Sequence, residues 1–165
     1  MKEQKEQKTN VMRILEQANI AYTPYFYDET TVPSGKSDYG VHVAELLGLD
    51  PEASFKTLVA QGASKNYYVY EVPVGDSLDL KKAAKAVGEK SIDLLPMAKL
   101  QAVTGYIRGG CSPVGMKKQF VTVLHETAQL YDVIDISAGK IGASVEVNPA
   151  DLMGLIGGIY ADIVV

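Results

Sequence analysis

Residues 54–74 read SFKTLVAQGASKNYYVYEVPV and predict two strands joined by a tight connection. The strands cover 55–60 and 67–74, because both runs are rich in β-branched and aromatic residues. The residues between them, 62–66, are small and polar, as in a hairpin connection. Both faces of the first strand are mainly apolar, so we expect other elements to cover both.

Short helices and further strands flank this pair in the sequence. Helical spacing of apolar residues, with capping and proline signals, predicts helices at 10–18, 41–47, 80–87, 96–103 and 149–156, and a helical turn at 126–130. Further strands are predicted at 21–27, 92–95, 121–124, 133–137, 145–147 and 159–165. This order is neither strictly alternating nor all-β, which indicates an α+β class with a mixed sheet.

Composition excludes several classes of protein. The chain of 165 residues is 47% hydrophobic and 22% charged, which rules out wholesale disorder and fits one domain over residues 1–165. A net charge of −4 excludes a basic nucleic-acid coat protein, so any RNA contact needs a local patch. The lone Cys111 excludes a disulfide framework and a cysteine-rich zinc site.

The ends of the chain indicate no export and no membrane. Residues 1–8 read MKEQKEQK, which has neither the apolar core nor the cleavage site of a secretory signal. No apolar run approaches the roughly 20 residues of a membrane-spanning helix. We therefore expect a cytoplasmic protein with no membrane partner.

Lys56 is the first candidate for chemistry. It shares a strand face with Leu58 and Ala60, where an ammonium group must reach water, meet an anion or lose its charge. A functional cation in a pocket satisfies this pattern. A lysine at the start of a strand that extends along its own stem to solvent also satisfies it.

The second candidate is the glycine-rich segment at 104–118, TGYIRGGCSPVGMKK. Its amides can hold a carbonyl oxygen or a phosphate, although a tight connection between elements has the same composition. It is not a Walker loop, because Met116 and Lys117 stand where lysine and Ser/Thr are required. Cys111 as a nucleophile needs a base and an orienting partner, and neither His42 nor His125 stands at a known spacing from a residue that could orient it.

Tyrosines bracket the first polar loop, which covers 28–38. They suit either an aromatic wall around a small group or ordinary strand packing, and they are Tyr22, Tyr25, Tyr27 and Tyr39. The two histidines of the chain come without a supporting carboxylate pattern, so no metal site is expected.

Four motifs together resemble the YbaK/EbsC family of aminoacyl-tRNA deacylases, relatives of the editing domain inserted in bacterial prolyl-tRNA synthetases. The motifs are FKTL at 55–58, LDLKKAA at 78–84, TGYIRGGCSPVG at 104–115 and SAGKIG at 137–142. The resemblance runs from roughly Val11 to Ile163. It implies a mixed, barrel-like β-sheet surrounded by helices, with a pocket at one end and no cofactor.

The resemblance also assigns roles to residues. The key lysine of the family falls on Lys56 and its glycine-rich loop on Gly109 through Pro113. Our hypothesis is that amides of Gly109, Gly110 and Cys111 bind the ester carbonyl oxygen, while Lys56 binds sugar–phosphate or ester oxygens. The implied substrate-binding residues are Tyr27, Tyr39, Thr57, Ser112, Pro113, Ser137 and Ser144. A positive surface for tRNA is expected from Lys81, Lys82, Lys85, Arg108, Lys117 and Lys118.

The activity implied is hydrolysis, in trans, of the ester in mischarged tRNA, most typically Cys-tRNA(Pro). The cysteine thiol of the substrate would attack its own ester carbonyl while the protein positions it. Relatives active on cysteine often carry an aspartate where Ser144 stands, so an Ala-tRNA(Pro) deacylase remains an alternative. A non-catalytic module that binds tRNA or a synthetase is another, and a hydrolase using Cys111 is the weakest. Prolyl-tRNA synthetase is a further expected partner, and DNA is not.

Overall fold

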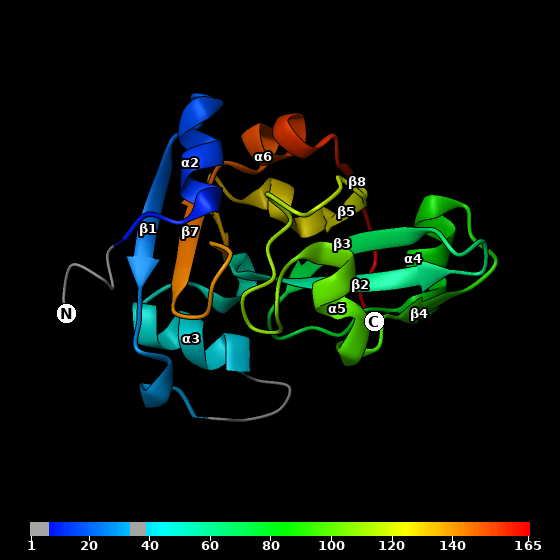
Figure 1. The fold of residues 1–165 in the computed structure, drawn as a ribbon, viewed down its shortest axis with the longest axis horizontal. Coiled ribbons are helices and arrows are strands. Elements are labelled where there is room, and N and C mark those ends of the chain that lie inside the picture. Colours follow the sequence, from blue (N-terminus) through cyan, green and yellow to red (C-terminus); the bar gives the residue numbers. More distant parts are fainter. Residues whose placement is uncertain (1–6, 34–38) are drawn as a thin grey trace.

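The computed structural model describes residues 7–33 and 39–165 (Figure 1). Most of the polar segment 1–8 and the second half of the loop 28–38 lie outside the described residues. The helices are α2 Asn10–Gln17, α3 Tyr39–Leu47, α4 Leu80–Val87, α5 Met97–Thr104 and α6 Pro149–Ile156, with 3-10 turns η1 Glu29–Thr31, η2 Pro51–Ala53 and η3 Glu126–Leu130. The strands are β1 Tyr22–Phe26, β2 Phe55–Gly62, β3 Tyr67–Pro73, β4 Ile92–Leu94, β5 Val121–His125, β6 Ile134–Ser137, β7 Ala143–Val147 and β8 Ile159–Ala161.

Side-chain caps fix the helix starts that the sequence predicts. The hydroxyl of Thr9 accepts from the amide of Met12, and the carboxylate of Asp79 accepts from two amides of the first turn of α4. Asn148 caps α6 in the same way, with Pro149 at its first position. The last strand is shorter than predicted: β8 ends at Ala161, and only a single bridge pairs Val164 with Leu78.

The strands form two sheets. The larger has the order β4-β2-β3-β5-β8. Its β4–β2 and β2–β3 pairs are antiparallel, and its β3–β5 and β5–β8 pairs are parallel. The smaller has the order β1-β7-β6 and is antiparallel throughout. A parallel bridge between Ser54 and Asp135 joins the sheets just before β2. The mixed α+β architecture is confirmed, whereas closure into a barrel is not found among the described strands.

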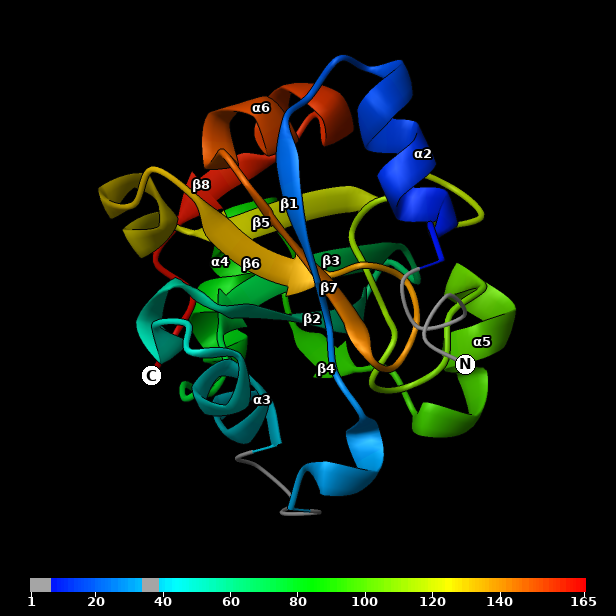
Figure 2. The same cartoon turned by 90° about the vertical axis from the view of Figure 1, so that its left-hand side faces the viewer.

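Helices and one loop cover the sheets. Ala83 and Ala84 of α4 pack on the face of the larger sheet that carries Tyr70. Cys111 packs on the opposite face, against Val59 and Val69. Figure 2 looks onto the smaller sheet, with α2 and α6 above it and α3 below. The apolar side of that sheet packs with α2 and α6 into the main core, which includes Val11, Leu15, Ile134, Ile136, Val145 and Leu152.

Candidate functional site

The smaller sheet has one apolar face and one polar face. Register pairs Tyr25 and Ser137 with Ser144, and Asp135 with Glu146. Because paired residues lie on the same side of a sheet and alternate residues share a face, these five side chains lie on the face opposite the main core. The hydroxyl of Tyr25 donates to Glu146 Oε1 at 2.8 Å. We call this surface the polar face.

Lys56 extends the polar face onto β2. The isolated parallel bridge between Ser54 and Asp135 brings the start of β2 against β6. Lys56, two residues after Ser54, projects from the same side of β2 as Ser54 does. Lys56 is half-buried, and burial lowers the pKa of its ammonium while Asp76 partly offsets that effect. Within the described residues the ammonium has no hydrogen bond and no ion pair. It is therefore a cation with free donors.

Two tyrosines close one end of the polar face. The amide of Tyr27 donates to the carbonyl of Gly142 at 2.9 Å, which ties the end of β1 to the turn before β7. Burial raises the pKa of the Tyr27 hydroxyl, and Tyr39 of α3 raises it further as its neighbour and hydrogen-bond partner. Asp135 also raises it at longer range. Tyr27 therefore lies next to Tyr39 and within electrostatic range of Asp135.

The glycine-rich segment rests on the turn that follows Ser137. A Cβ built on Gly110 would come within 3.1 Å of Lys140 Cα, and one on Gly109 within 3.3 Å of the Ile141 side chain. A side chain at Gly110 would push on the backbone of this turn, and the positive φ of Gly109 is one that L side chains rarely adopt. The amide of Gly110 donates to the carbonyl of Ile107 at 3.0 Å, whereas those of Gly109 and Cys111 have no backbone acceptor among the described residues. Two of the three predicted amide donors are therefore available.

The remaining predicted residues face away from Lys56. Thr57 stands opposite Glu71 in the hairpin, on the β2 face that packs against Cys111. Burial raises the pKa of the Cys111 thiol to about 12, and the nearby Glu71 adds to the effect. Ser112 is buried and its hydroxyl accepts from the Val114 amide at 3.3 Å; Pro113 beside it is also buried. The side chains of Thr57 and Cys111 therefore do not face Lys56, and those of Ser112 and Pro113 are buried within the loop.

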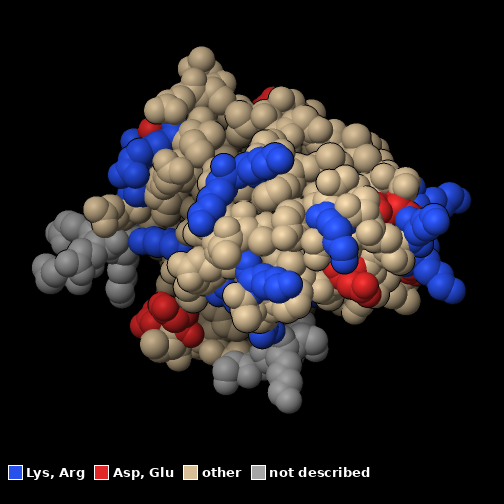
Figure 3. All heavy atoms as spheres, turned by 45° about the vertical axis from the view of Figure 1, so that its right-hand side comes forward, with Lys and Arg blue, Asp and Glu red and all other residues tan. Residues whose placement is uncertain are grey.

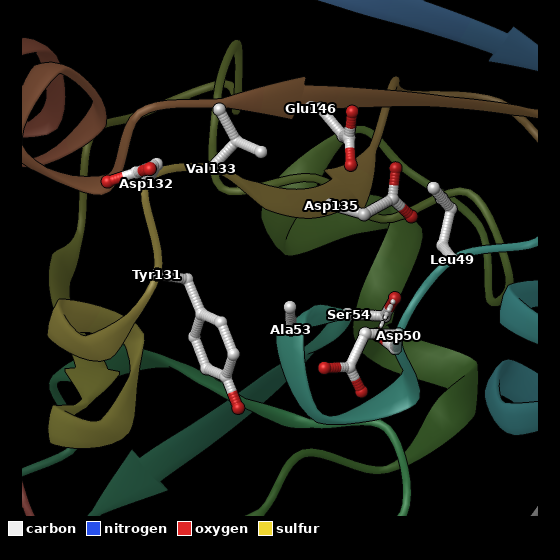
Figure 4. Close-up of a pocket in the computed structure, with 9 residues that line it drawn as sticks. All are labelled: Leu49, Asp50, Ala53, Ser54, Tyr131, Asp132, Val133, Asp135 and Glu146. Atoms are coloured by element: carbon white, nitrogen blue, oxygen red, sulfur yellow. Dashed lines mark hydrogen bonds between the residues drawn. The ribbon is translucent and has the colours of Figure 1, made fainter.

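An acidic cavity of about 250 Å³ adjoins the other end of the polar face. Figure 4 shows Asp135 and Glu146 projecting from β6 and β7 toward a wall formed by the η2 segment. The lining residues are Leu49, Asp50, Ala53, Ser54, Tyr131, Asp132, Val133, Asp135 and Glu146. Burial raises the pKa of Asp135 to about 7, Ser144 lowers it and Glu146 raises it. Asp135 and Glu146 belong both to the lining of this cavity and to the polar face, so the cavity adjoins that face.

A family model for the aminoacyl-tRNA editing domain matches residues 38–155, which is most of the chain. The chain belongs to the aminoacyl-tRNA editing domain family. A protein of Enterococcus faecalis with the provisional name Cys-tRNA(Pro)/Cys-tRNA(Cys) deacylase EbsC is 44% identical over 98% of this chain and 96% of its own length. The editing domain therefore has a full-length relative with a named activity.

Solved structures share the fold of this editing domain. One, described as a proposed trans-editing enzyme for prolyl-tRNA synthetase, has a TM-score of 0.78 at 22% identity and covers 96% of this chain and 99% of its own. Another, the hypothetical protein APE2540, has a TM-score of 0.82 at 19% identity and covers 95% and 100%. At these identities the likeness shows the fold alone.

The basic residues of the editing domain do not form one surface. Lys81, Lys82 and Lys85 lie on α4, which covers one face of the larger sheet, whereas the loop that carries Arg108 and Lys117 covers the other. Lys82 is moreover engaged, since its Nζ donates to Asp162 at 3.0 Å and to the Val164 carbonyl at 2.8 Å. Figure 3 shows blue side chains spread across the middle of one face and a separate group at its edge.

Sequence reasoning about the editing domain missed Asp135, Glu146 and the cavity. The sequence did carry a signal for them, because residues 134–137 read IDIS and alternate between apolar and polar side chains. This pattern is typical of a strand with one buried face and one polar face. Among the described residues, no group of three or more His, Cys, Asp or Glu side chains could hold a metal ion. None of the described helices has the length and apolarity needed to cross a membrane.

Replacement of Cys111 by alanine is expected to leave hydrolysis of an aminoacyl ester within about twofold of wild type. A thiol whose pKa is raised to about 12 is protonated near neutral pH and is a poor nucleophile. The measurement is the steady-state rate of each protein at pH 7.5, at an assay temperature well below both melting temperatures. Loss of the chemical step in Cys111→Ala would instead make the thiol the nucleophile.

Proposed function

We propose that this editing domain acts in trans as a hydrolase that removes a wrongly attached amino acid from tRNA, with Cys-tRNA(Pro) as its substrate. The observation that supports the proposal is the polar face, on which register pairs Ser137 with Ser144 and against which the start of β2, with Lys56, is bridged. The name of the 44% identical relative supports the choice of cysteine. The whole chain serves as one domain, in the cytoplasm.

In the proposed mechanism the protein positions the ester and stabilises developing charge. The Lys56 ammonium has free donors for the sugar–phosphate or ester oxygens at the tRNA end. The free amides of Gly109 and Cys111 are donors for the carbonyl oxygen. The substrate thiol forms a bond to the ester carbonyl carbon, the ester C–O bond breaks, and the thiol proton passes to the ribose oxygen. Water then opens the cyclic thioester, so no protein nucleophile is required.

A second candidate substrate is Ala-tRNA(Pro). Ser144, which faces the site, offers a small neutral hydroxyl where relatives active on cysteine often carry a carboxylate. Alanine has no thiol, so water must then attack the ester carbonyl directly while the same donors hold the carbonyl oxygen.

The proposed contact with tRNA is confined to the loop side of the molecule. Arg108, Lys117 and Lys118 lie within the glycine-rich segment and are exposed, while the α4 lysines lie over the opposite face of the larger sheet. Few phosphate contacts and a net charge of −4 imply weak, salt-sensitive binding directed at the RNA backbone. Prolyl-tRNA synthetase is the proposed partner that supplies selection of the tRNA.

A deacylation panel tests the proposal. Proline tRNA charged with cysteine, alanine or serine is incubated with wild type, and the loss of ester is compared with the spontaneous rate. We expect rapid loss from Cys-tRNA(Pro), whereas faster loss of alanine would select the second candidate. Hydrolysis of none of the three above the spontaneous rate, with or without added prolyl-tRNA synthetase, would remove the proposed function.

A further inference from the structure

The acidic cavity holds one carboxylate that is both buried and incompletely partnered. Glu146 accepts from the Tyr25 hydroxyl, Asp50 accepts from the Glu52 amide at 2.8 Å, and Asp132 is exposed to solvent. Asp135 is only 8% exposed, and its Oδ1 has no hydrogen-bond partner among the described residues. Asp135 also lines the cavity, and the Ser144 hydroxyl, which lowers its pKa, is the neighbouring donor. A buried carboxylate with so few donors is costly unless a ligand supplies another.

The charge of the cavity restricts what that ligand can be. Carboxylates repel the phosphates of RNA, so the nucleic-acid backbone does not enter here. The described residues also offer no cluster suited to a metal ion. In tRNA charged with cysteine or alanine, the cationic group next to the ester is the α-ammonium of the amino acid. A primary ammonium is also a good donor to a buried carboxylate, because charge-assisted hydrogen bonds are the strong ones.

The position of Asp135 suits that group. It shares the polar face with Ser137, Ser144 and Lys56, and it precedes Ser137 by one step along that face. An ester held at the Lys56 end therefore has its α-carbon substituents within reach of Asp135. The opposite charges at the two ends of the polar face match the phosphate and the ammonium of one aminoacyl-tRNA terminus.

We propose that Asp135 binds the α-ammonium of the aminoacyl ester, so that the site selects substrates with an unblocked amino group. The inference rests on the proposed function. Burial and Glu146 hold the pKa of Asp135 near 7, so the arrival of an ammonium stabilises its ionised form. Asp135 is thus a specificity-determining residue, and N-blocked or peptidyl esters lack the group that it recognises.

The test compares esters that differ only at nitrogen. Cys-tRNA(Pro) and Ala-tRNA(Pro), each with a free or an N-acetylated amino group, are incubated with wild type, Asp135→Asn and the double variant Asp135→Asn/Ser144→Asp. Asp93→Asn, which alters an exposed carboxylate of β4, is the matched control. Binding of an alanyl-amide-linked adenosine and its N-acetyl form, neither of which has an ester, is measured in parallel, together with each melting temperature.

We expect wild type and Asp93→Asn to prefer the free amine by about 10- to 100-fold in kcat/KM, the factor that one charged hydrogen bond supplies. In Asp135→Asn this preference should disappear because kcat/KM falls for the free-amine substrate and not for the acetylated one. The double variant should recover part of the preference, because its new carboxylate at position 144 lies beside position 135. An unchanged preference in Asp135→Asn, or no preference in wild type, overturns the inference. If wild type hydrolyses no ester, the proposed function fails, while binding of the amide probes still decides the role of Asp135.

Discussion

Replacement of Lys56 by alanine is expected to lower kcat/KM for deacylation by about 10²- to 10³-fold, the usual cost of removing one preorganised electrostatic donor. The reason is the environment of the Lys56 ammonium group. It is half-buried on the polar face, burial lowers its pKa, and no described residue accepts its hydrogen bonds. Such a group interacts more strongly with developing negative charge than an exposed lysine does.

Lys56→Arg separates charge from shape. Its planar guanidinium keeps the charge but does not replace a compact ammonium, so we expect it to remain impaired as well. Lys90→Ala, at an exposed position, is the matched control and should retain the wild-type rate. Because burial disfavours the Lys56 ammonium, neutral replacements should melt no lower than wild type. A Lys56→Ala protein with a full deacylation rate would contradict the assignment.

Replacement of Glu71 by methionine should stabilise the fold by about 1–3 kcal/mol at pH 8, the typical cost of an unsatisfied buried polar group. Glu71 is 0% exposed, and neither carboxylate oxygen has a hydrogen bond of normal geometry within the described residues. Burial raises its pKa well above the ordinary value of 4.5, and the nearby Thr57 hydroxyl offsets this only in part. The neutral thioether of methionine meets no such cost.

The effect of Glu71 depends on pH with a definite sign. Above pH 4.5 the unfolded chain has lost the Glu71 proton while the folded protein retains it. Stability therefore falls as pH rises through that window until the folded-state pKa is passed. The pKa of Asp135 is raised from 3.8 to about 7, so Asp135 also makes stability fall as pH rises. This contribution is still present in Glu71→Met.

Urea unfolding of wild type, Glu71→Met and the exposed control Glu52→Gln between pH 4 and 9 measures this slope. We expect the slope to be shallower in Glu71→Met alone. Equal slopes in all three proteins would mean that Glu71 is ionised in the folded state, with a partner that the geometry does not provide.

Local patterns in the sequence were sufficient for most elements, but not for how faces combine. The alternation within FKTL already separates Lys56 from Thr57, so their placement on opposite faces follows from strand geometry. The motifs at 104–115 and 137–142 were both part of the family resemblance, and the contact of Gly110 with Lys140 shows that they lie together in the fold. The separation of the α4 lysines from Lys117 depends instead on which sheet face each segment covers, and that is a property of topology.

The acidic cavity illustrates the same limit more sharply. Asp135 and Glu146 become neighbours only through the register of β6 and β7, and the wall that carries Asp50 comes from a distant segment. Nothing within a short window of sequence encodes that register. The barrel-like sheet, expected from resemblance, likewise depends on long-range pairing, and the described strands make two sheets joined by one bridge.

The pairing of β1 with β7 has a consequence for biosynthesis. Tyr25 and its partner Glu146 are 121 positions apart, so the first strand emerges from the ribosome long before its neighbour exists. Contacts of such separation form late because a long loop must be closed first. A nascent chain that stops short of β7 leaves β1 without its partner strand, so the smaller sheet cannot form until β7 has been synthesised.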